Sequence, residues 1–233
     1  MLRIRHSQER GRTQLPWLDG RHSFSFGNYY DPAHMGFGPL RVINEDVIAP
    51  GGGFPTHGHA NMEIITVVLS GALAHRDSLG NGSTIRPGEV QRMSAGSGIE
   101  HSEFNASKTE PVRLLQIWIQ PDKSNLKPSY DQKSFPFDEQ DGQALKLVVS
   151  SDAREGSIAI HQDAALYFGH LKAGQSINRK LTSARRSWIQ VASGAVEVNN
   201  QRLSSGDAAA IENEDLLQLR AETESQILVF DLP

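Results

Sequence analysis

The sequence contains no cysteine among its 233 residues, and this absence excludes disulfides, thiolate zinc sites and a cysteine nucleophile together. Any bound metal must therefore use nitrogen and oxygen ligands. The chain also lacks an apolar run near the ~18 residues that a membrane-spanning helix requires. Polar residues follow its N-terminus in place of the apolar core of a secretory signal. We expect a cytoplasmic protein without a membrane partner.

Basic residues are neither abundant nor clustered. Lysine and arginine number 23 against 27 aspartates and glutamates, which gives a formal net charge of -4. Neutralising a row of phosphates needs a dense run of basic residues, and the sequence has none of that kind. Direct nucleic-acid binding is therefore not expected.

What the sequence does contain is a series of short apolar segments separated by turn residues. Glycine and asparagine supply the positive φ that tight turns require, as in Leu79-Gly80-Asn81-Gly82. Helical periodicity is limited to about one turn near residues 7–10 and 151–155. These features predict an all-β fold, sandwich or barrel, with strands at residues 40–43, 64–69, 114–119, 145–149, 188–191 and 227–230.

Two domains are expected, because 233 residues exceed the roughly 100 to 150 of a common single domain. The polar stretch from Pro121 to Gly142 carries few strand signals and suits an interdomain connection. The halves also resemble each other, since Ser70-Gly71-Ala72 and Ser193-Gly194-Ala195 each follow a predicted strand. We predict one β-barrel in residues 1–125 and a second, with the linker, in residues 126–233.

Two pairs of candidate metal ligands stand two residues apart, and such residues point to the same face of a strand. The first pair is His57-Gly58-His59. Alone it is weak evidence, because nine histidines in this chain give about a third of one such pair by chance. The second pair, His101-Ser102-Glu103, makes a four-ligand site on two strands. Three imidazoles and one carboxylate suit iron, manganese, cobalt, nickel, copper or zinc, among which ligand type does not choose.

The spacing of these residues resembles the two motifs of the cupin superfamily. Its first motif corresponds to Gly51, His57, His59, Glu63 and Gly71, and its second to Gly88, Gly96, His101 and Asn105. Ser94 stands where the second motif has proline, and the gap from Gly96 to His101 is longer than the motif has. The generic match is therefore imperfect.

A narrower resemblance is to the pirin family. It is carried by the His57-Gly58-His59 motif, the run from His75 to Asn81, and the run from Ser94 to Glu103. The N-terminal segments Trp17-Leu18, His22-Ser23-Phe24-Ser25-Phe26 and Tyr29-Tyr30-Asp31-Pro32 also look like those of pirins. The resemblance is close over residues 11–121 and looser over the rest.

The resemblance implies a bicupin, with two jelly-roll-like cupin barrels and one divalent metal ion per chain. The ligands implied are His57, His59, His101 and Glu103. Fe(II) is the expected ion, with Cu, Mn, Co, Ni or Zn as alternatives. Glu63 fills the general cupin carboxylate position, but the pirin pattern gives the fourth ligand to Glu103. We therefore expect Glu63 to support the site from outside or to face solvent.

The second half carries no matching ligands. Applying the first motif's spacing from Gly174 places Lys180 and Thr182 where histidines belong, and the second motif places Leu217 and Leu219 there. Neither pair replaces histidine, so the second barrel is expected to bind no metal and to have a structural or interface role.

Three functions are consistent with these observations. The resemblance implies quercetin 2,3-dioxygenase activity, which opens the central ring of a planar aromatic flavonol with O2, and Glu103 is the candidate catalytic base. The alternative is a metal-containing regulatory or redox-sensing protein, like the eukaryotic pirins, that acts through a protein partner. A metal-dependent isomerase or hydrolase is the third class, because cupins support many chemistries.

The remaining histidines and the aromatic residues leave two further alternatives. Five histidines lack same-face partners in the sequence and are expected at the surface or in hydrogen-bonded core positions: His22, His34, His75, His161 and His170. An alternative for His22 and His34 is a place beside a pocket, because both lie in the aromatic N-terminal segment. The aromatic side chains either fill the core or line a cavity for a planar ligand; they are Phe24, Phe26, Tyr29, Phe37 and Phe54.

Overall fold

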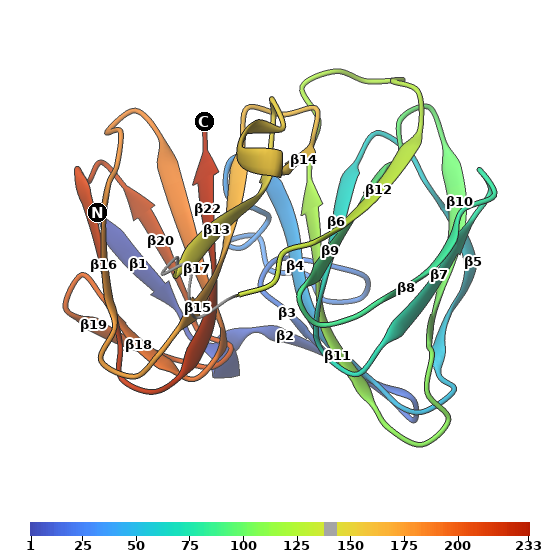
Figure 1. Cartoon of the computed structure of the whole chain (residues 1–233), viewed down its shortest axis with the longest axis horizontal. Coiled ribbons are helices and arrows are strands. Elements are labelled where there is room, and N and C mark those ends of the chain that lie inside the picture. The colour runs from blue at the N-terminus through green and yellow to red at the C-terminus, as the bar shows by residue number, and fades with distance from the viewer. Residues whose placement is uncertain (138–143) are drawn as a thin grey trace. The chain divides into compact units, whose positions relative to one another are not determined.

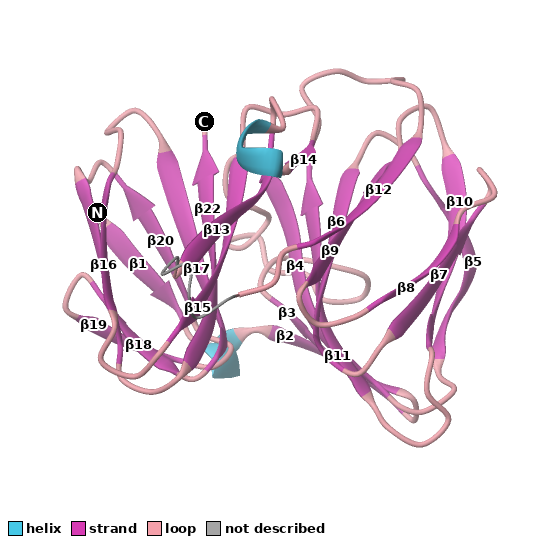
Figure 2. Ribbon diagram, viewed as in Figure 1, coloured by secondary structure: helices cyan, strands magenta, loops and turns pink. Residues whose placement is uncertain are grey.

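The short apolar segments form β-strands in the computed structural model, which describes residues 1–137 and 144–233 (Figure 2). Each strand expected from the sequence lies within an observed strand, and the expected all-β class is confirmed. Helix in the described part is limited to two 3-10 turns, η1 (Ser7–Glu9) and η2 (Arg154–Gly156). No helix in these ranges is long and apolar enough to cross a membrane.

The described residues divide into two units (Figure 1). The first barrel, as we name it, comprises Gly11–Pro136 together with Ile160–Gln162. The second barrel comprises the described residues of Met1–Arg10, Phe137–Ala159 and Asp163–Pro233. Each unit has one seven-stranded and one four-stranded sheet.

The first barrel has antiparallel sheets throughout. Its larger sheet has, in spatial order, β12 (Ser129–Ser134), β9 (Glu89–Ser94), β6 (Glu63–Ser70), β11 (Val112–Ile119), β4 (Leu40–Ile48), β3 (Leu18–His22) and β2 (Gly11–Leu15). Its smaller sheet has β5 (Gly53–His59), β10 (Ile99–Asn105), β7 (Leu73–Asp77) and β8 (Gly82–Ile85).

The second barrel repeats this arrangement. Its larger sheet has β1 (Leu2–Arg5), β20 (Ala208–Glu212), β17 (Arg186–Ser193), β22 (Ser225–Leu232), β15 (Ala165–Leu171), β13 (Leu145–Ser150) and β14 (Ile158–Ala159). Its smaller sheet has β16 (Ser176–Lys180), β21 (Leu216–Ala221), β18 (Ala195–Val198) and β19 (Gln201–Ser204).

The matching strand order supports the duplication expected from the sequence. The order β9-β6-β11-β4-β3 in the first barrel corresponds to β20-β17-β22-β15-β13 in the second. Gly71 and Gly194 occupy corresponding hairpins, one in each barrel. Their φ angles are 76° and 83°, a region in which a residue with a side chain is strained. Residues of the two barrels can therefore be compared position by position.

The division of the chain differs from the expected boundary at residue 125. Met1–Arg10 belongs to the second barrel, because β1 pairs with β20. The first barrel continues through β12, which pairs with β9 inside the stretch expected to be a linker. Residues 138–142 of that expected linker lie outside the described residues.

The second barrel has an apolar interior at the positions compared with the metal motifs. Leu217 and Leu219 are buried in its core cluster, where each contributes roughly 1.5 to 3 kcal/mol by leaving water. Lys180 and Thr182, the residues expected in place of the first histidine pair, are each one position too far along the chain. Lys180 and Thr182 are exposed, because alternation along β16 points Arg179 inward, where its guanidinium lies 3.9 Å from the Tyr167 ring centroid.

Candidate metal centre and its pocket

Three of the four expected ligands converge on neighbouring strands of the smaller sheet of the first barrel. His57 on β5 lies directly opposite His101 on β10, and His59 lies opposite Ile99. Alternation along β5 turns both of its histidines to one face. One donor nitrogen of each of the three imidazoles lies within 4.8 Å of the other two, which is close enough for one ion to bind all three.

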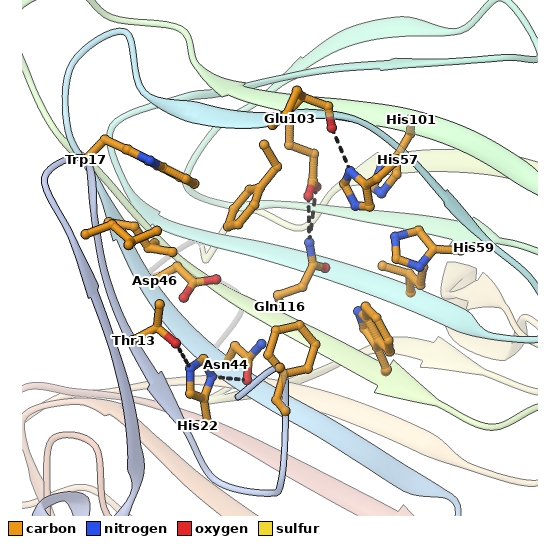
Figure 3. A pocket seen from close by; sticks show the side chains of 18 of the residues that line it. Thr13, Trp17, His22, Asn44, Asp46, His57, His59, His101, Glu103 and Gln116 are labelled. Atoms are coloured by element: carbon orange, nitrogen blue, oxygen red, sulfur yellow. Dashed lines mark hydrogen bonds between the residues drawn. The ribbon is translucent and has the colours of Figure 1, made fainter. Parts of the chain in front are cut away.

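Glu103 lies beside this cluster, after a bulge that shifts the register of β10 against β5 between His101 and Glu103. Its carboxylate is grouped with His101 and His75, not with His57 and His59. The Gln116 amide on β11 donates to both carboxylate oxygens, at 3.1 and 3.0 Å. Glu103 is therefore held at the edge of the cluster by a side chain from the larger sheet (Figure 3).

The environment of Glu103 moves the pKa of its carboxyl group close to neutral pH. The side chain is buried, and this burial raises its pKa to about 7, with the Gln116 hydrogen bonds acting in the opposite direction. In turn, Gln116 accepts a hydrogen bond from the Thr66 hydroxyl at 3.1 Å. A carboxylate in this state can exchange a proton at physiological pH.

The imidazoles are held in the neutral form that binds a cation. The pKa of His59 is lowered to about 4 and that of His101 to about 3; burial is the larger cause for both, and the neighbouring histidines are the second. The Nδ1 of His57 lies 2.8 Å from the Pro55 carbonyl oxygen. Because a carbonyl only accepts, Nδ1 carries the hydrogen and Nε2 keeps its lone pair for a ligand.

His101 provides a test of whether these residues fit a metal. It is 2% exposed, and neither ring nitrogen has a hydrogen-bond partner among the residues that the structure describes. A buried polar atom without a partner costs about 1 to 3 kcal/mol, and such atoms in native structures call for an explanation. A cation bound between His101 and its neighbours would supply a partner for one of these nitrogens, so the donor set fits a metal ion.

His75 occupies a hydrogen-bonded position in the core, one of the two alternatives expected for it, but the premise that it has no same-face partner in the sequence was wrong. It lies on β7 directly opposite Glu103, and its Nε2 is 3.4 Å from the buried carboxylate of Asp77. Burial lowers the pKa of His75, with Asp77 acting in the opposite direction. The signal in the sequence was the His75-Arg76-Asp77 spacing, which places both side chains on one face. The pairing with Glu103 was not readable, because it depends on the register between β7 and β10.

Glu63 lies buried away from the three histidines. Its carboxylate accepts a hydrogen bond from Ser94 at 2.6 Å and lies 3.0 Å from Nδ1 of His161. The solvent-facing alternative for Glu63 is therefore wrong, and His161 has a specific partner. The other two outlying histidines bind carboxylates outside the centre: His34 binds Asp31, and His170 binds Glu224.

A cavity of about 540 Å³ in the first barrel connects the histidines to an aromatic wall. The two tryptophans on this wall are Trp17 and Trp118, and the Trp118 ring stands edge-on to His59 with centroids 4.9 Å apart. Phe26 and Phe54 also line the cavity. Of the other expected aromatic residues, Phe24 and Phe37 are buried in the core. Of the five aromatic residues expected either to fill the core or to line a cavity, Phe26 and Phe54 therefore line the cavity.

The far side of the cavity from the histidines has a polar wall (Figure 3). His22 contributes to it, as the sequence left open, with its Nδ1 2.8 Å from Asn44 Oδ1 and its Nε2 2.8 Å from the Thr13 hydroxyl. Asp46, two residues after Asn44 on β4, also lines the cavity. Nothing in the sequence marked Asn44 or Asp46 as site residues.

Two small β-barrels, one of them enclosing a cluster of histidines and a carboxylate, define a two-domain cupin. Comparison with known families agrees: residues 3–119 match the family model described as Pirin, and residues 147–232 match the model described as Quercetinase C-terminal cupin domain. The chain belongs to the pirin family.

Similar proteins extend over the whole chain. A protein of Escherichia coli (strain K12) named quercetin 2,3-dioxygenase is 48% identical, covering 100% of this chain and 99% of that protein. A pirin-like protein of Caulobacter vibrioides is 41% identical, covering 92% of each. The crystal structure of the bacterial pirin YhhW from Escherichia coli in complex with nickel(II) has a TM-score of 0.95 and 46% identity, covering 100% of this chain and 99% of that one.

Proposed function

We propose that the first barrel is the centre of a metal-dependent dioxygenase that opens the central ring of a flavonol with O2. The observation that carries the proposal is the convergence of three imidazoles and a buried carboxylate on the wall of an apolar cavity. Its volume of about 540 Å³ lies in the range of cavities that bind small organic ligands. The E. coli relative named quercetin 2,3-dioxygenase supports the choice of reaction.

In this proposal His57, His59, His101 and Glu103 hold one divalent ion, and Fe(II) is the native metal. The ion, when bound, supplies Lewis acidity and an open position at which substrate and O2 meet. The neutral state of the buried imidazoles favours binding, because no proton must first be displaced from them. No equivalent donor group is present among the described residues of the second barrel, so the proposal is one ion per chain.

Glu103 is the proposed general base. With a pKa of about 7 it is ionised in part of the molecules at neutral pH, and it can take the proton of the flavonol hydroxyl that approaches the centre. The two hydrogen bonds from Gln116 keep the carboxylate directed toward this position. The aromatic walls formed by Trp118 and Phe54 hold a planar ligand against the histidines and exclude water.

An aerobic assay of the protein reconstituted with Fe(II) tests this function. We expect loss of flavonol absorbance that depends on O2, and a rate lowered by about 10² to 10⁴ in Glu103→Gln. Glu45→Gln is the matched control, because Glu45 is on β4 and pairs with Arg113 away from the cavity lining. An unchanged rate in Glu103→Gln would refute the base assignment. Absence of turnover with every reconstituted metal would refute the enzyme and favour the regulatory alternative.

A further inference from the structure

A row of polar side chains crosses the interior of the first barrel at one register. Five consecutive strands of the larger sheet contribute one residue each, every residue lying directly opposite the next. The row is Gln91, Thr66, Gln116, Asn44 and His22. All but Gln116 are at most 2% exposed. The interior of this barrel therefore contains buried polar side chains at positions where a barrel of this kind can have apolar ones.

The second barrel shows that the fold does not require this row. The same positions, matched through strand order and register, are Ala209, Ile189, Val229, Tyr167 and Leu147, all members of its apolar core cluster. Burying polar groups in place of apolar ones costs free energy unless they are hydrogen-bonded. The polar row is therefore a property of the barrel with the cavity.

Within the row, Asn44 presents a hydrogen-bond donor to the cavity. Its Oδ1 is occupied by Nδ1 of His22, whose Nε2 accepts from the Thr13 hydroxyl. With Oδ1 directed at His22, Nδ2 and its two N–H donors are left for the cavity. Asn44 is 2% exposed and lines the cavity, and no residue in the described ranges accepts a hydrogen bond from its Nδ2.

Asp46 presents acceptors beside this donor. It follows Asn44 by two residues on β4, so both side chains point to the same face, and it is 5% exposed on the cavity wall. Gly20 lies opposite, and a Cβ there would come within 2.7 Å of Asp46 Oδ1. The counterpart of Asp46 in the second barrel is Gly169. The acidic side chain, like the polar row, is confined to the first barrel.

We infer that Asn44 and Asp46 form a hydroxyl-recognition pair that selects flavonols hydroxylated on the ring remote from the metal centre. A phenolic hydroxyl both accepts and donates, so it complements an amide N–H beside a carboxylate. Figure 3 shows the pair across the cavity from His57, His59 and His101, with Gln116 between them. The inference rests on the proposed function, because it assumes that a flavonol occupies the cavity.

The test is a binding titration with the Zn(II)-loaded protein under nitrogen, where the absence of O2 prevents turnover, following the fluorescence of Trp17 and Trp118 on the cavity wall. The ligands are quercetin and 3-hydroxyflavone, which share the metal-binding end but differ in their other hydroxyls. A hydrogen bond to a charged group corresponds to about 10- to 100-fold in affinity. We expect quercetin to bind more tightly than 3-hydroxyflavone by a factor in that range.

Asp46→Asn keeps the shape of the side chain and removes its charge. The affinity ratio should then fall about five- to tenfold, while the affinity for 3-hydroxyflavone changes less than about threefold. Asn44→Asp, which keeps an acceptor for His22 and loses the donor, should lower the ratio similarly and serves if the first variant does not fold. Glu45→Gln, whose side chain pairs with Arg113, should leave the ratio unchanged.

The outcomes separate the two proposals. An unchanged ratio in both pocket variants would overturn the recognition pair and leave the dioxygenase proposal standing. The expected ratios together with no aerobic turnover in any metal form would support the pair and overturn the dioxygenase proposal. Failure of the wild-type protein to bind either ligand would overturn both.

Discussion

Gln116 should set the pH at which the centre binds metal. Its Nε2 donates to both oxygens of the buried Glu103 carboxylate, at 3.1 and 3.0 Å, and these bonds hold the pKa of Glu103 below the value that burial alone would give. Gln116→Leu preserves the approximate volume and removes the donor. The change therefore isolates the hydrogen bonds from the packing.

The size of the effect follows from the charge on the acceptor. Hydrogen bonds to a charged group contribute roughly 1.5 to 3 kcal/mol, and one pKa unit corresponds to about 1.36 kcal/mol. The pKa of Glu103 in Gln116→Leu should rise by about one to two units. Because a cation binds the ionised carboxylate, the midpoint of metal binding against pH should move upward by about the same amount.

Competition between the protein and a chromophoric chelator for Ni(II), measured across the neutral and alkaline range, gives this midpoint. Thr66→Val is the graded control, because it removes only the hydroxyl that donates to Gln116 and leaves the bonds to Glu103 in place. Its midpoint should move by less than about half a unit. Coincident profiles for wild type and Gln116→Leu would refute the role of Gln116, provided that both proteins show cooperative thermal unfolding.

Two further predictions concern stability. The pKa of His101 is lowered from 6.5 to about 3, mainly by burial. Below about pH 6.5 the unfolded chain therefore binds a proton at this residue that the folded metal-free protein does not bind, and the free energy of unfolding falls as the pH is lowered toward 3. In urea unfolding of the metal-free protein, His101→Gln should make the free energy of unfolding fall less steeply with decreasing pH. An equally steep fall would contradict the lowered pKa of His101. Leu217→Ala should lower the free energy of unfolding by roughly 2 to 5 kcal/mol, because Leu217 is fully buried in the second barrel. Metal content per folded chain should not change in that variant, and a loss of metal would show that the second barrel contributes to the centre.

Local patterns in the sequence were sufficient for the six strands that were expected and for the first histidine pair. His57 and His59 share a face because side chains alternate along β5, which any strand of that sequence would do. The hairpin at Gly71 was likewise readable, since its positive φ requires glycine. These features depend on neighbours in the chain, so no tertiary information was needed.

What could not be predicted depends on pairing between distant strands. Nothing within residues 1–10 indicates that β1 adds to β20, so the boundary at residue 125 failed at its N-terminal end. His75 lies opposite Glu103 through the register of β7 against β10, and Gln116 reaches Glu103 from a strand of the other sheet. The motif spacing applied to the second half placed Lys180 one position too far along the chain, because the bulge between β5 and β10 is not repeated between β16 and β21.

The central claim is that one ion is bound per chain by His57, His59, His101 and Glu103. Anomalous diffraction from crystals of the metal-loaded protein, recorded at the absorption edge of the bound ion, locates it directly. We expect a single peak at full occupancy between the three imidazoles, with Glu103 turned toward it. A peak held instead by His75, His101 and Glu103, the second donor group of this barrel, would contradict the claim, as would a second peak in the other barrel.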